Sequence, residues 1–173
     1  MSEPVLVPIS HDQFVEDVRA IAAKLANDQW QPDFLIGVGR GGLVPGAYLS
    51  HASGMTLLSV DYSSQVFAFA DELLRQLATK SIDGKKLLIV DDINDSGTTI
   101  AQLRAALKSA GAVDSNIRVA VLLNNIRSSA TADYWAREID RATDKSWFVF
   151  PWEAMAPTTT LIEDSAAVPE RLA

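Results

Sequence analysis

The chain has 173 residues, 48% of them apolar and 21% charged, with a net charge of −7 and no cysteine. This length and composition suit a single globular domain spanning 1–173. An acidic chain without a basic run disfavours binding to nucleic acid, and no apolar run is long enough to span a bilayer. The lack of cysteine excludes disulfides and thiolate metal sites, and the first residues show no secretory signal. A cytoplasmic protein is expected.

Helices and short apolar strands alternate through the first part of the chain. Residues 10–27 predict a helix, because Ser10 and Gln13 have capping-box spacing and apolar side chains follow at helical period. A strand is predicted over 33–39. The helix after it is expected to have Pro45 in its first turn and to end near residue 54, before a second strand over 56–62.

The same alternation continues in the second part. Residues 63–84 fit a helix, and strands are predicted over 86–92 and 117–123, with a well-patterned helix over 98–111 between them. The segment 146–153 is short and apolar and is broken by a proline. The tail beyond residue 157 is weakly patterned, and no element is predicted there.

Apolar strands alternating with helices indicate an α/β fold with a mainly parallel sheet, flanked by helices on both faces. Ligands of such folds bind outside the carboxyl ends of the strands. Two polar, glycine-containing stretches, 37–42 and 91–99, follow predicted strands at such ends. We therefore expect one site built from two loops.

The stretch 91–99 places three acids directly after an apolar strand and follows them with small polar residues: Asp91, Asp92, Asp95, Ser96, Gly97, Thr98 and Thr99. The three carboxylates repel one another, so a cation or a hydroxyl-rich ligand is expected beside them. The amides that open the next helix have no partner within the helix and carry the positive end of its dipole. Residues 95–99 therefore predict a phosphate cradle. The alternative is a simple helix cap with solvated acids.

The sequence VDDINDSGTT at 90–99 resembles the phosphoribosyl-pyrophosphate motif of the type I phosphoribosyltransferases. The resemblance implies that family's sheet, with a small base-binding hood, and a requirement for Mg²⁺. It also implies that Asp91 contacts the ribose, that Asp92 is a magnesium ligand, and that Asp95 is the catalytic acid or base near the purine N7. The 5′-phosphate would bind at 96–99.

The glycine-rich stretch has two interpretations. Gly37, Gly39 and Gly42 satisfy the dinucleotide fingerprint, and Asp61 ends the next strand, so an NAD-binding oxidoreductase is one alternative. The same stretch is similar to the pyrophosphate loop of bacterial xanthine-guanine phosphoribosyltransferases. That resemblance implies that Arg40 and Gly41 bind pyrophosphate and that the peptide bond between 39 and 40 can be cis.

The segment 146–153 resembles the purine pocket of the same family, although aromatic residues beside a proline also suit a core. The resemblance implies that Trp147 stacks on the base, that the backbone of Phe148 reads its edge and that Glu153 helps to hold a second metal ion. Trp152 is expected only to pack. Asn125 stands where purine transferases carry a lysine for the 6-oxo group, so it is the expected base contact.

The expected reaction is transfer of the 5-phosphoribosyl group from phosphoribosyl pyrophosphate to a 6-oxopurine, in a homo-dimer or homo-tetramer. A nucleotide-sensing regulator on the same fold is the main alternative, ahead of the oxidoreductase. Tyr62 and Ser63 match the pair that the family carries on its mobile loop. Whether 63–84 forms a lid or an oligomer contact is left open.

Overall fold

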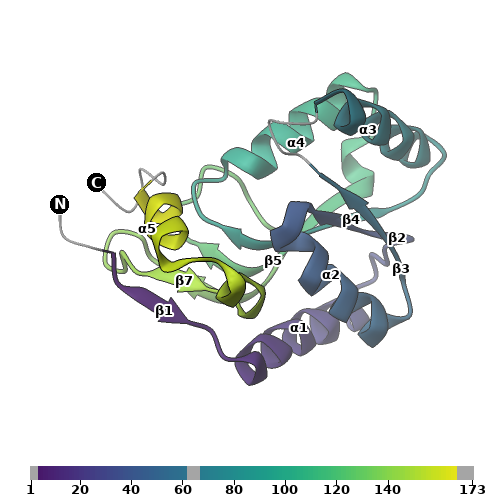
Figure 1. Ribbon diagram of the computed structural model, residues 1–173. Helices are drawn as coiled ribbons and strands as arrows, with labels where there is room; N and C mark the ends of the chain where they lie inside the picture. Colours follow the sequence, from purple (N-terminus) through teal and green to yellow (C-terminus); the bar gives the residue numbers. More distant parts are fainter. Residues whose placement is uncertain (1–3, 62–66, 167–173) are drawn as a thin grey trace.

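The computed structural model describes residues 4–61 and 67–166. Its body is a five-stranded parallel sheet with strand order β3-β2-β4-β5-β6 (Figure 1). The strands are β2 (Phe34–Val38), β3 (Thr56–Val60), β4 (Leu87–Asn94), β5 (Ile117–Asn125) and β6 (Tyr134–Ile139). Because all five are parallel, their carboxyl ends lie along one edge of the sheet, as predicted.

Helices cover both faces of this sheet. They are α1 (His11–Ala26) and α2 (Gly39–Ser53) on one face, with α3 (Phe67–Ile82) and α4 (Thr98–Ser109) on the other (Figure 1). Strand β4 shows the reason. Leu88 and Val90 belong to the core beneath α1 and α2, whereas Leu87 and Ile89 belong to the core beneath α4 and α3. Alternate side chains of a strand point to opposite faces, so an all-apolar strand needs two covers.

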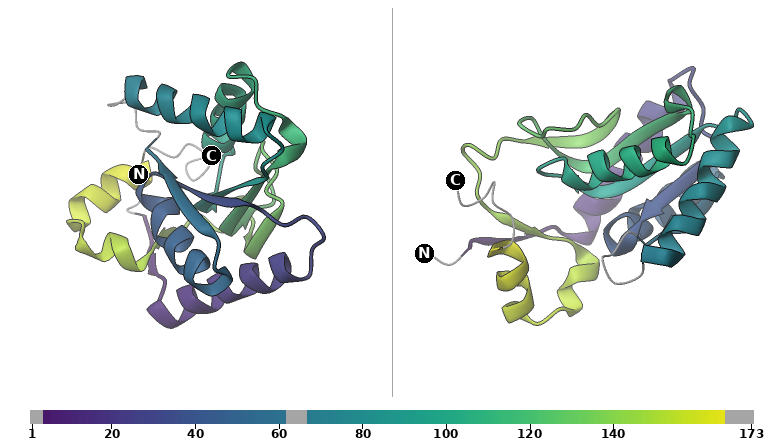
Figure 2. Two further views of the ribbon diagram at one scale, coloured as in Figure 1. Left: turned by 90° about the vertical axis from the view of Figure 1, so that its right-hand side faces the viewer. Right: turned by 90° about the horizontal axis from the view of Figure 1, so that it is seen from above.

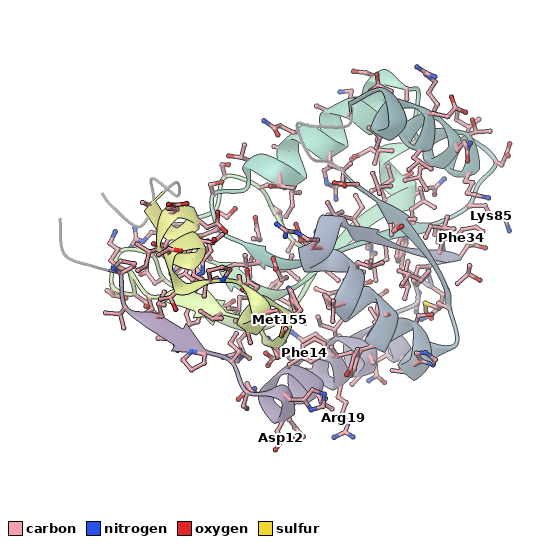
Figure 3. All side chains as sticks on the ribbon, in the orientation of Figure 1. Asp12, Phe14, Arg19, Phe34, Lys85 and Met155 are labelled. Atoms are coloured by element: carbon pink, nitrogen blue, oxygen red, sulfur yellow. The ribbon has the colours of Figure 1, made fainter. Side chains whose placement is uncertain are left out.

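Helix α1 follows the predicted pattern closely. The Ser10 side chain accepts a hydrogen bond from the Gln13 amide at 3.1 Å and so caps the helix. Phe14 is almost fully buried on the inner face, whereas Asp12 and Arg19 point away from the body (Figure 3). The Gln13 side chain bonds Asp17 at 3.0 Å instead of closing a capping box.

A smaller unit lies beside the main sheet (Figure 2). Here β1 (Leu6–Pro8) pairs in parallel with β7 (Trp147–Val149), and the 3₁₀ helix η2 (Pro151–Met155) and α5 (Thr158–Ala166) follow. We call these four elements the hood. A further 3₁₀ turn, η1 (Asp114–Asn116), precedes β5. Helix α5 lies in the tail for which no element was predicted, and β1 and β6 were also missed.

Several boundaries differ from the predicted ones. Helix α2 begins at Gly39, so Pro45 lies inside the helix and not in its first turn. Strand β4 runs two residues past its predicted end, to Asn94, because its pairing with β5 continues as far as Asn124. The expected loop pair at 62 and 63 lies outside the described residues. No helix in the described ranges is long and apolar enough to cross a membrane.

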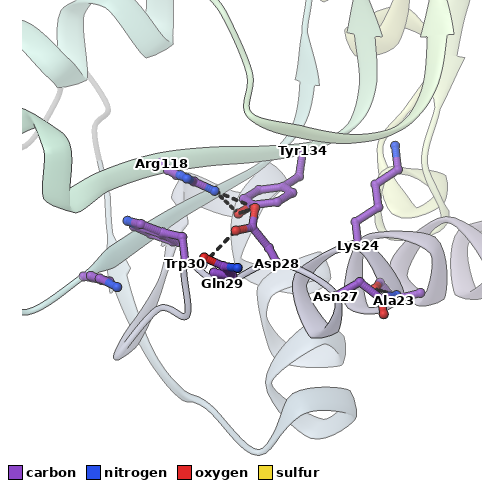
Figure 4. A pocket seen from close by; sticks show the side chains of 9 residues that line it. Ala23, Lys24, Asn27, Asp28, Gln29, Trp30, Arg118 and Tyr134 are labelled. Atoms are coloured by element: carbon purple, nitrogen blue, oxygen red, sulfur yellow. Dashed lines mark hydrogen bonds and ion pairs between the residues drawn. The ribbon is translucent and has the colours of Figure 1, made fainter.

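A cluster of polar side chains lies at the opposite edge of the sheet. It lines a cavity of about 930 Å³ between α1 and the starts of β5 and β6 (Figure 4). Asp28 accepts hydrogen bonds from the Trp30 amide at 2.7 Å, from Arg118 at 2.7 Å and from the Tyr134 hydroxyl at 2.8 Å. The Trp30 amide is the main reason that the pKa of Asp28 falls to about 2, whereas burial raises the pKa of Tyr134 to about 12. These contacts tie the α1–β2 connection to two strands.

Candidate active site

A cavity of about 1020 Å³ lies at the carboxyl edge of the sheet, between the main body and the hood. Four segments line it: 38–41 at the start of α2, Asp61 just after β3, 91–100 from β4 into α4, and parts of η2 and α5. The cavity brings together ten of the residues singled out from the sequence, namely Arg40, Gly41, Asp91, Asp92, Asp95, Ser96, Gly97, Thr98, Thr99 and Glu153. The two predicted loops therefore do form one site.

The start of α2 packs directly against the end of β4. A Cβ atom on Gly42 would lie 2.0 Å from the Val90 carbonyl oxygen, and one on Gly41 would lie 2.5 Å from a carboxylate oxygen of Asp92. Both distances are far below van der Waals contact: the Val90 backbone leaves room only for glycine at 42, whereas a side chain at 41 would displace the Asp92 carboxylate. The glycines thus serve to bring Arg40 and the helix terminus against the acids.

The peptide bond between Gly39 and Arg40 is trans, as are all described peptide bonds. The expectation of a cis bond at this position is therefore wrong. Helix α2 already begins at Gly39, so the chain passes directly from β2 into the helix.

Negative charge is concentrated at the end of β4. Burial, and then the charge of Asp92, raises the pKa of Asp91 well above its ordinary value. Burial, and then the charge of Glu153, raises the pKa of Asp92 to about 7. The Asp92 amide donates a 3.0 Å hydrogen bond to the Asp91 carboxylate, and this bond offsets only part of the rise in the Asp91 pKa. A cation bound here would relieve the repulsion.

Glu153 brings a further carboxylate from the hood. Burial raises its pKa, the charge of Asp164 adds to this effect and the charge of Arg40 opposes it. One carboxylate oxygen also accepts a 2.9 Å hydrogen bond from the Phe150 amide and so caps η2. Glu153 is therefore both a structural cap and a source of negative potential at the mouth of the cavity.

The donor set suits Mg²⁺, which prefers carboxylate oxygens and keeps several water or substrate ligands. Among the described residues, no group of three or more acids or histidines is arranged to hold an ion by itself. The electrostatic interaction between Asp92 and Glu153 shows that two carboxylates from different elements share one environment. Such a pair fits an ion whose remaining ligands come from a bound substrate.

The turn before α4 is held from the side by the loop 128–130. The Ser129 amide and hydroxyl both donate to the Ser96 carbonyl, at 3.0 and 2.7 Å. Gly97 has φ +87°, and a Cβ atom there would lie 2.4 Å from the Ala130 nitrogen, so glycine is required. The Ser96 hydroxyl accepts from the Thr98 amide at 3.1 Å. A helix terminus whose first-turn amides have no partner within the helix therefore lines the cavity.

Asp95 forms a buried ion pair that the sequence did not reveal. Arg141 Nε lies 2.9 Å from one carboxylate oxygen of Asp95, and a terminal nitrogen of Arg141 lies 2.8 Å from the other. The side chains are only 3% exposed for Arg141 and 14% exposed for Asp95. Because 46 positions separate the two residues, no local pattern could have indicated the pair.

Asn125, the expected base contact, does not line the cavity. It is 2% exposed and its amide group is already used. Its nitrogen donates to the Asp95 carbonyl at 2.9 Å, and its oxygen accepts from the amides of Arg127 and Arg141 at 3.2 and 3.3 Å. Asn125 therefore holds backbone segments together.

The hood contributes a different surface from the one expected. Trp147 and Phe148 are not among the residues that line the cavity, whereas Trp152 is. Trp152 also stacks on Phe150 at a centroid distance of 4.9 Å, so it packs as predicted and faces the cavity as well. Asp164 lines the cavity from α5. The weakly patterned sequence around it did not indicate a place in the site.

A parallel sheet with acids at the end of its central strand, a phosphate-type helix terminus beside them and a hood across the cavity defines a type I phosphoribosyltransferase fold. Residues 10–157 match the phosphoribosyl transferase domain family. The chain belongs to this family and is a phosphoribosyltransferase. That assignment replaces the oxidoreductase interpretation of the glycine-rich stretch.

Relatives agree with this assignment. The chain is 30% identical over 152 residues to a xanthine-guanine phosphoribosyltransferase of Gluconobacter oxydans (strain 621H), covering 84% of this chain and 83% of the relative. A purine phosphoribosyltransferase from Pyrococcus horikoshii has a TM-score of 0.62 and 28% identity, over 86% of this chain and 94% of the other. A hypothetical protein from Neisseria gonorrhoeae with bound ppGpp shares the fold, with a TM-score of 0.65 and 22% identity over 100% of both chains.

Proposed function

We propose that the protein transfers the 5-phosphoribosyl group from phosphoribosyl pyrophosphate to a 6-oxopurine, releasing pyrophosphate and forming the nucleoside monophosphate. One observation carries the proposal: the helix terminus at 96–99 and the acids at 91 and 92 line the same cavity as Arg40. This arrangement offers donors for a phosphate, acceptors for ribose hydroxyls and a cation for a leaving group. The Gluconobacter and Pyrococcus relatives, both named for purines, support a purine as the acceptor.

The residues divide between the two ends of the substrate. The amides at 96–99 hold the 5′-phosphate, and Asp91 accepts hydrogen bonds from the ribose hydroxyls. Arg40 and the Gly41 amide bind the pyrophosphate. Asp92, together with Glu153, holds Mg²⁺, which when bound neutralises charge on the departing pyrophosphate.

The reaction is a displacement at the anomeric carbon of the ribose. A ring nitrogen of the purine forms the new bond to this carbon while the bond to the pyrophosphate oxygen breaks, and positive charge develops on the ribose. The purine loses a proton, and in this proposal Asp95 takes it. Asp95 lines the cavity beside the phosphate turn, which supports this role.

The hood supplies the base pocket in this proposal. Strand β7, with Trp147 and Phe148, leads directly into the segment that brings Trp152 and Glu153 into the cavity. The resemblance assigns stacking on the base to Trp147 and recognition of its edge to the Phe148 backbone, and both residues lie on β7 outside the lining of the cavity. Asn125 holds the Asp95 loop and is not a base contact, because its amide group is engaged by the backbone.

Nucleotide sensing is a second candidate, supported by the ppGpp-bound Neisseria structure, which matches over the full length of both chains. The same phosphate turn and hood would bind a purine nucleotide carrying several phosphates. The two functions differ in turnover, so one assay separates them.

The test is pyrophosphate release from phosphoribosyl pyrophosphate and Mg²⁺ with guanine, xanthine, hypoxanthine and adenine, with Asp92→Asn as the control variant. Release with a 6-oxopurine that Asp92→Asn abolishes is the expected result. Release only with adenine would refute the choice of base. No pyrophosphate release with any of the four bases, together with ppGpp binding that phosphoribosyl pyrophosphate displaces, would establish a nucleotide sensor instead.

A further inference from the structure

Arg141 lies on the loop between β6 and β7, and its guanidinium group joins two parts of the site. On one side it makes the two-point contact with the Asp95 carboxylate, at 2.9 and 2.8 Å. On the other side its remaining terminal nitrogen donates to the carbonyl oxygens of Ser146 at 2.6 Å and Asp144 at 3.3 Å. The Phe148 ring lies 5.3 Å from the guanidinium carbon. Arg141 thus contacts the end of β4 and the start of β7 at once.

Asn125 closes this arrangement at the backbone. Its side-chain nitrogen donates to the Asp95 carbonyl, and its oxygen accepts from the Arg141 amide. The ends of β4 and β5 and the loop before β7 are therefore joined in one network of Asp95, Asn125 and Arg141. All three side chains are shielded from water, since the residues Asn125 and Arg141 are 2% and 3% exposed and the Asp95 side chain is 14% exposed.

The chain contains a second ion pair of the same geometry, which shows what a purely structural pair looks like. Arg137 contacts Asp17 through Nε at 3.0 Å and through a terminal nitrogen at 2.8 Å, and the Asp17 side chain is 3% exposed. This pair joins β6 to α1, and neither residue lines the cavity. Arg141 differs because its partner faces the cavity and its other contacts lead into β7.

We propose that Arg141 is a positioning residue that holds Asp95 and the base-binding strand β7 in a fixed relative geometry. The inference rests on the proposed function, in which Asp95 takes the purine proton and β7 carries the base contacts. A carboxylate held at both oxygens by one guanidinium cannot rotate, and the same guanidinium fixes the backbone before Trp147. The base and the group that accepts its proton are therefore placed by one side chain.

The phosphate end of the site does not depend on Arg141. The turn at 96–99 is held by the loop 128–130, and the start of α2 is held against β4 by its glycines. Loss of Arg141 should therefore weaken binding of the base and leave binding of the ribose phosphate intact. A general loss of folding would weaken both.

The test compares two ligands that differ only in the base. Calorimetric titration measures the affinities of guanosine 5′-monophosphate and of ribose 5-phosphate for the wild type, Arg141→Met and Arg141→Lys, with Arg137→Met as the matched control. We expect Arg141→Met to bind the nucleotide about 10- to 100-fold more weakly with ribose 5-phosphate affinity unchanged, and Arg141→Lys to recover part of the loss. Arg137→Met should lower the melting temperature and leave both affinities unchanged.

Each other outcome has a definite meaning. Equal weakening of both ligands by Arg141→Met, or a loss of nucleotide affinity in Arg137→Met as large as in Arg141→Met, would overturn the inference in favour of a structural role. Should Arg141→Met fail to fold, Arg141→Lys alone must show the selective loss. If the wild type turns over a purine and Arg141→Met binds both ligands as well as the wild type does, the proposed role of Arg141 is refuted and the proposed function stands. A wild type that binds neither ligand would refute the proposed function and the inference with it.

Discussion

At the residue scale, Gly41 controls the position of Asp92. A methyl group on Gly41 would meet the Asp92 carboxylate at 2.5 Å, and the carboxylate is the movable end of a side chain. Gly41→Ala should therefore push the carboxylate aside and weaken binding of phosphoribosyl pyrophosphate with Mg²⁺ about 10- to 100-fold. Calorimetric titration measures this affinity, and a melting curve of the same sample measures stability.

Gly54→Ala is the control for this substitution. Gly54 lies at the far end of α2, and no atom lies within 4 Å of a methyl group added there. Its φ of +73° makes alanine strained at this position. It should lower stability by about 1 kcal/mol without changing ligand affinity. Retained affinity in Gly41→Ala would show that Asp92 is not a direct participant.

Residues of the site were predictable where the chemistry is local. Asp92 and the glycine at 97 could be placed from the sequence, because a strand end, an acid pair and a helix terminus lie within ten positions. Asn125 was assigned a base contact because its side chain stands where the resembling family carries a lysine. The partners that actually use that side chain, Asp95 and Arg141, come from other loops. Their contacts exist only in the folded chain.

At the element scale, the first turn of α4 is the predicted phosphate site. Saturation with ribose 5-phosphate should slow hydrogen exchange of the amides at 98–100, about 100-fold at a ligand concentration 100 times Kd. The first turn of α1, capped by Ser10, should show no change. Nuclear magnetic resonance exchange measurements check this, and equal protection of both helix termini would point to a global effect instead of a phosphate site.

Elements were predictable where the apolar pattern is strong and the neighbours are close in sequence. Helix α4 was placed within two residues at its carboxyl end, whereas β6 was missed because charged Arg137 and Glu138 interrupt its pattern. The three residues of β1 become a strand only by pairing with β7, 141 positions later. Helix α5 has just two buried residues, Leu161 and Ser165, which is too few to produce a clear helical period.

At the scale of the whole molecule, alternation of apolar strands and helices was sufficient to predict a parallel sheet with two helical covers. The place of the hood was not predictable from that pattern, because the hood combines residues 6–8 with residues 147–166. This union brings Glu153 and Asp164 to the acids of β4. The electrostatics of the site are thus a property of the assembled chain.

That electrostatic arrangement predicts how stability depends on pH. The folded pKa of Asp92 is about 7 against 3.8 for the ordinary carboxyl. Between these values the unfolded chain has lost the Asp92 proton and the folded chain retains it, so stability falls as pH rises from about 4 to about 7. Asp28 acts in the opposite direction, since its folded pKa is about 2. Its stabilisation is complete above about pH 4 and is lost as pH falls toward 2.

The free energy of unfolding of the ligand-free protein should therefore be greatest near pH 4 to 5 and should fall by roughly 2–4 kcal/mol toward pH 7. Asp92→Asn should reduce this fall and stabilise the ligand-free protein at pH 7, because a neutral amide carries no charge to be buried or to be repelled by Glu153. Urea denaturation at a series of pH values measures both. Mg²⁺ with phosphoribosyl pyrophosphate should restore wild-type stability at pH 7 and do so far less in Asp92→Asn. An unchanged fall in Asp92→Asn would place the responsible charge on another group.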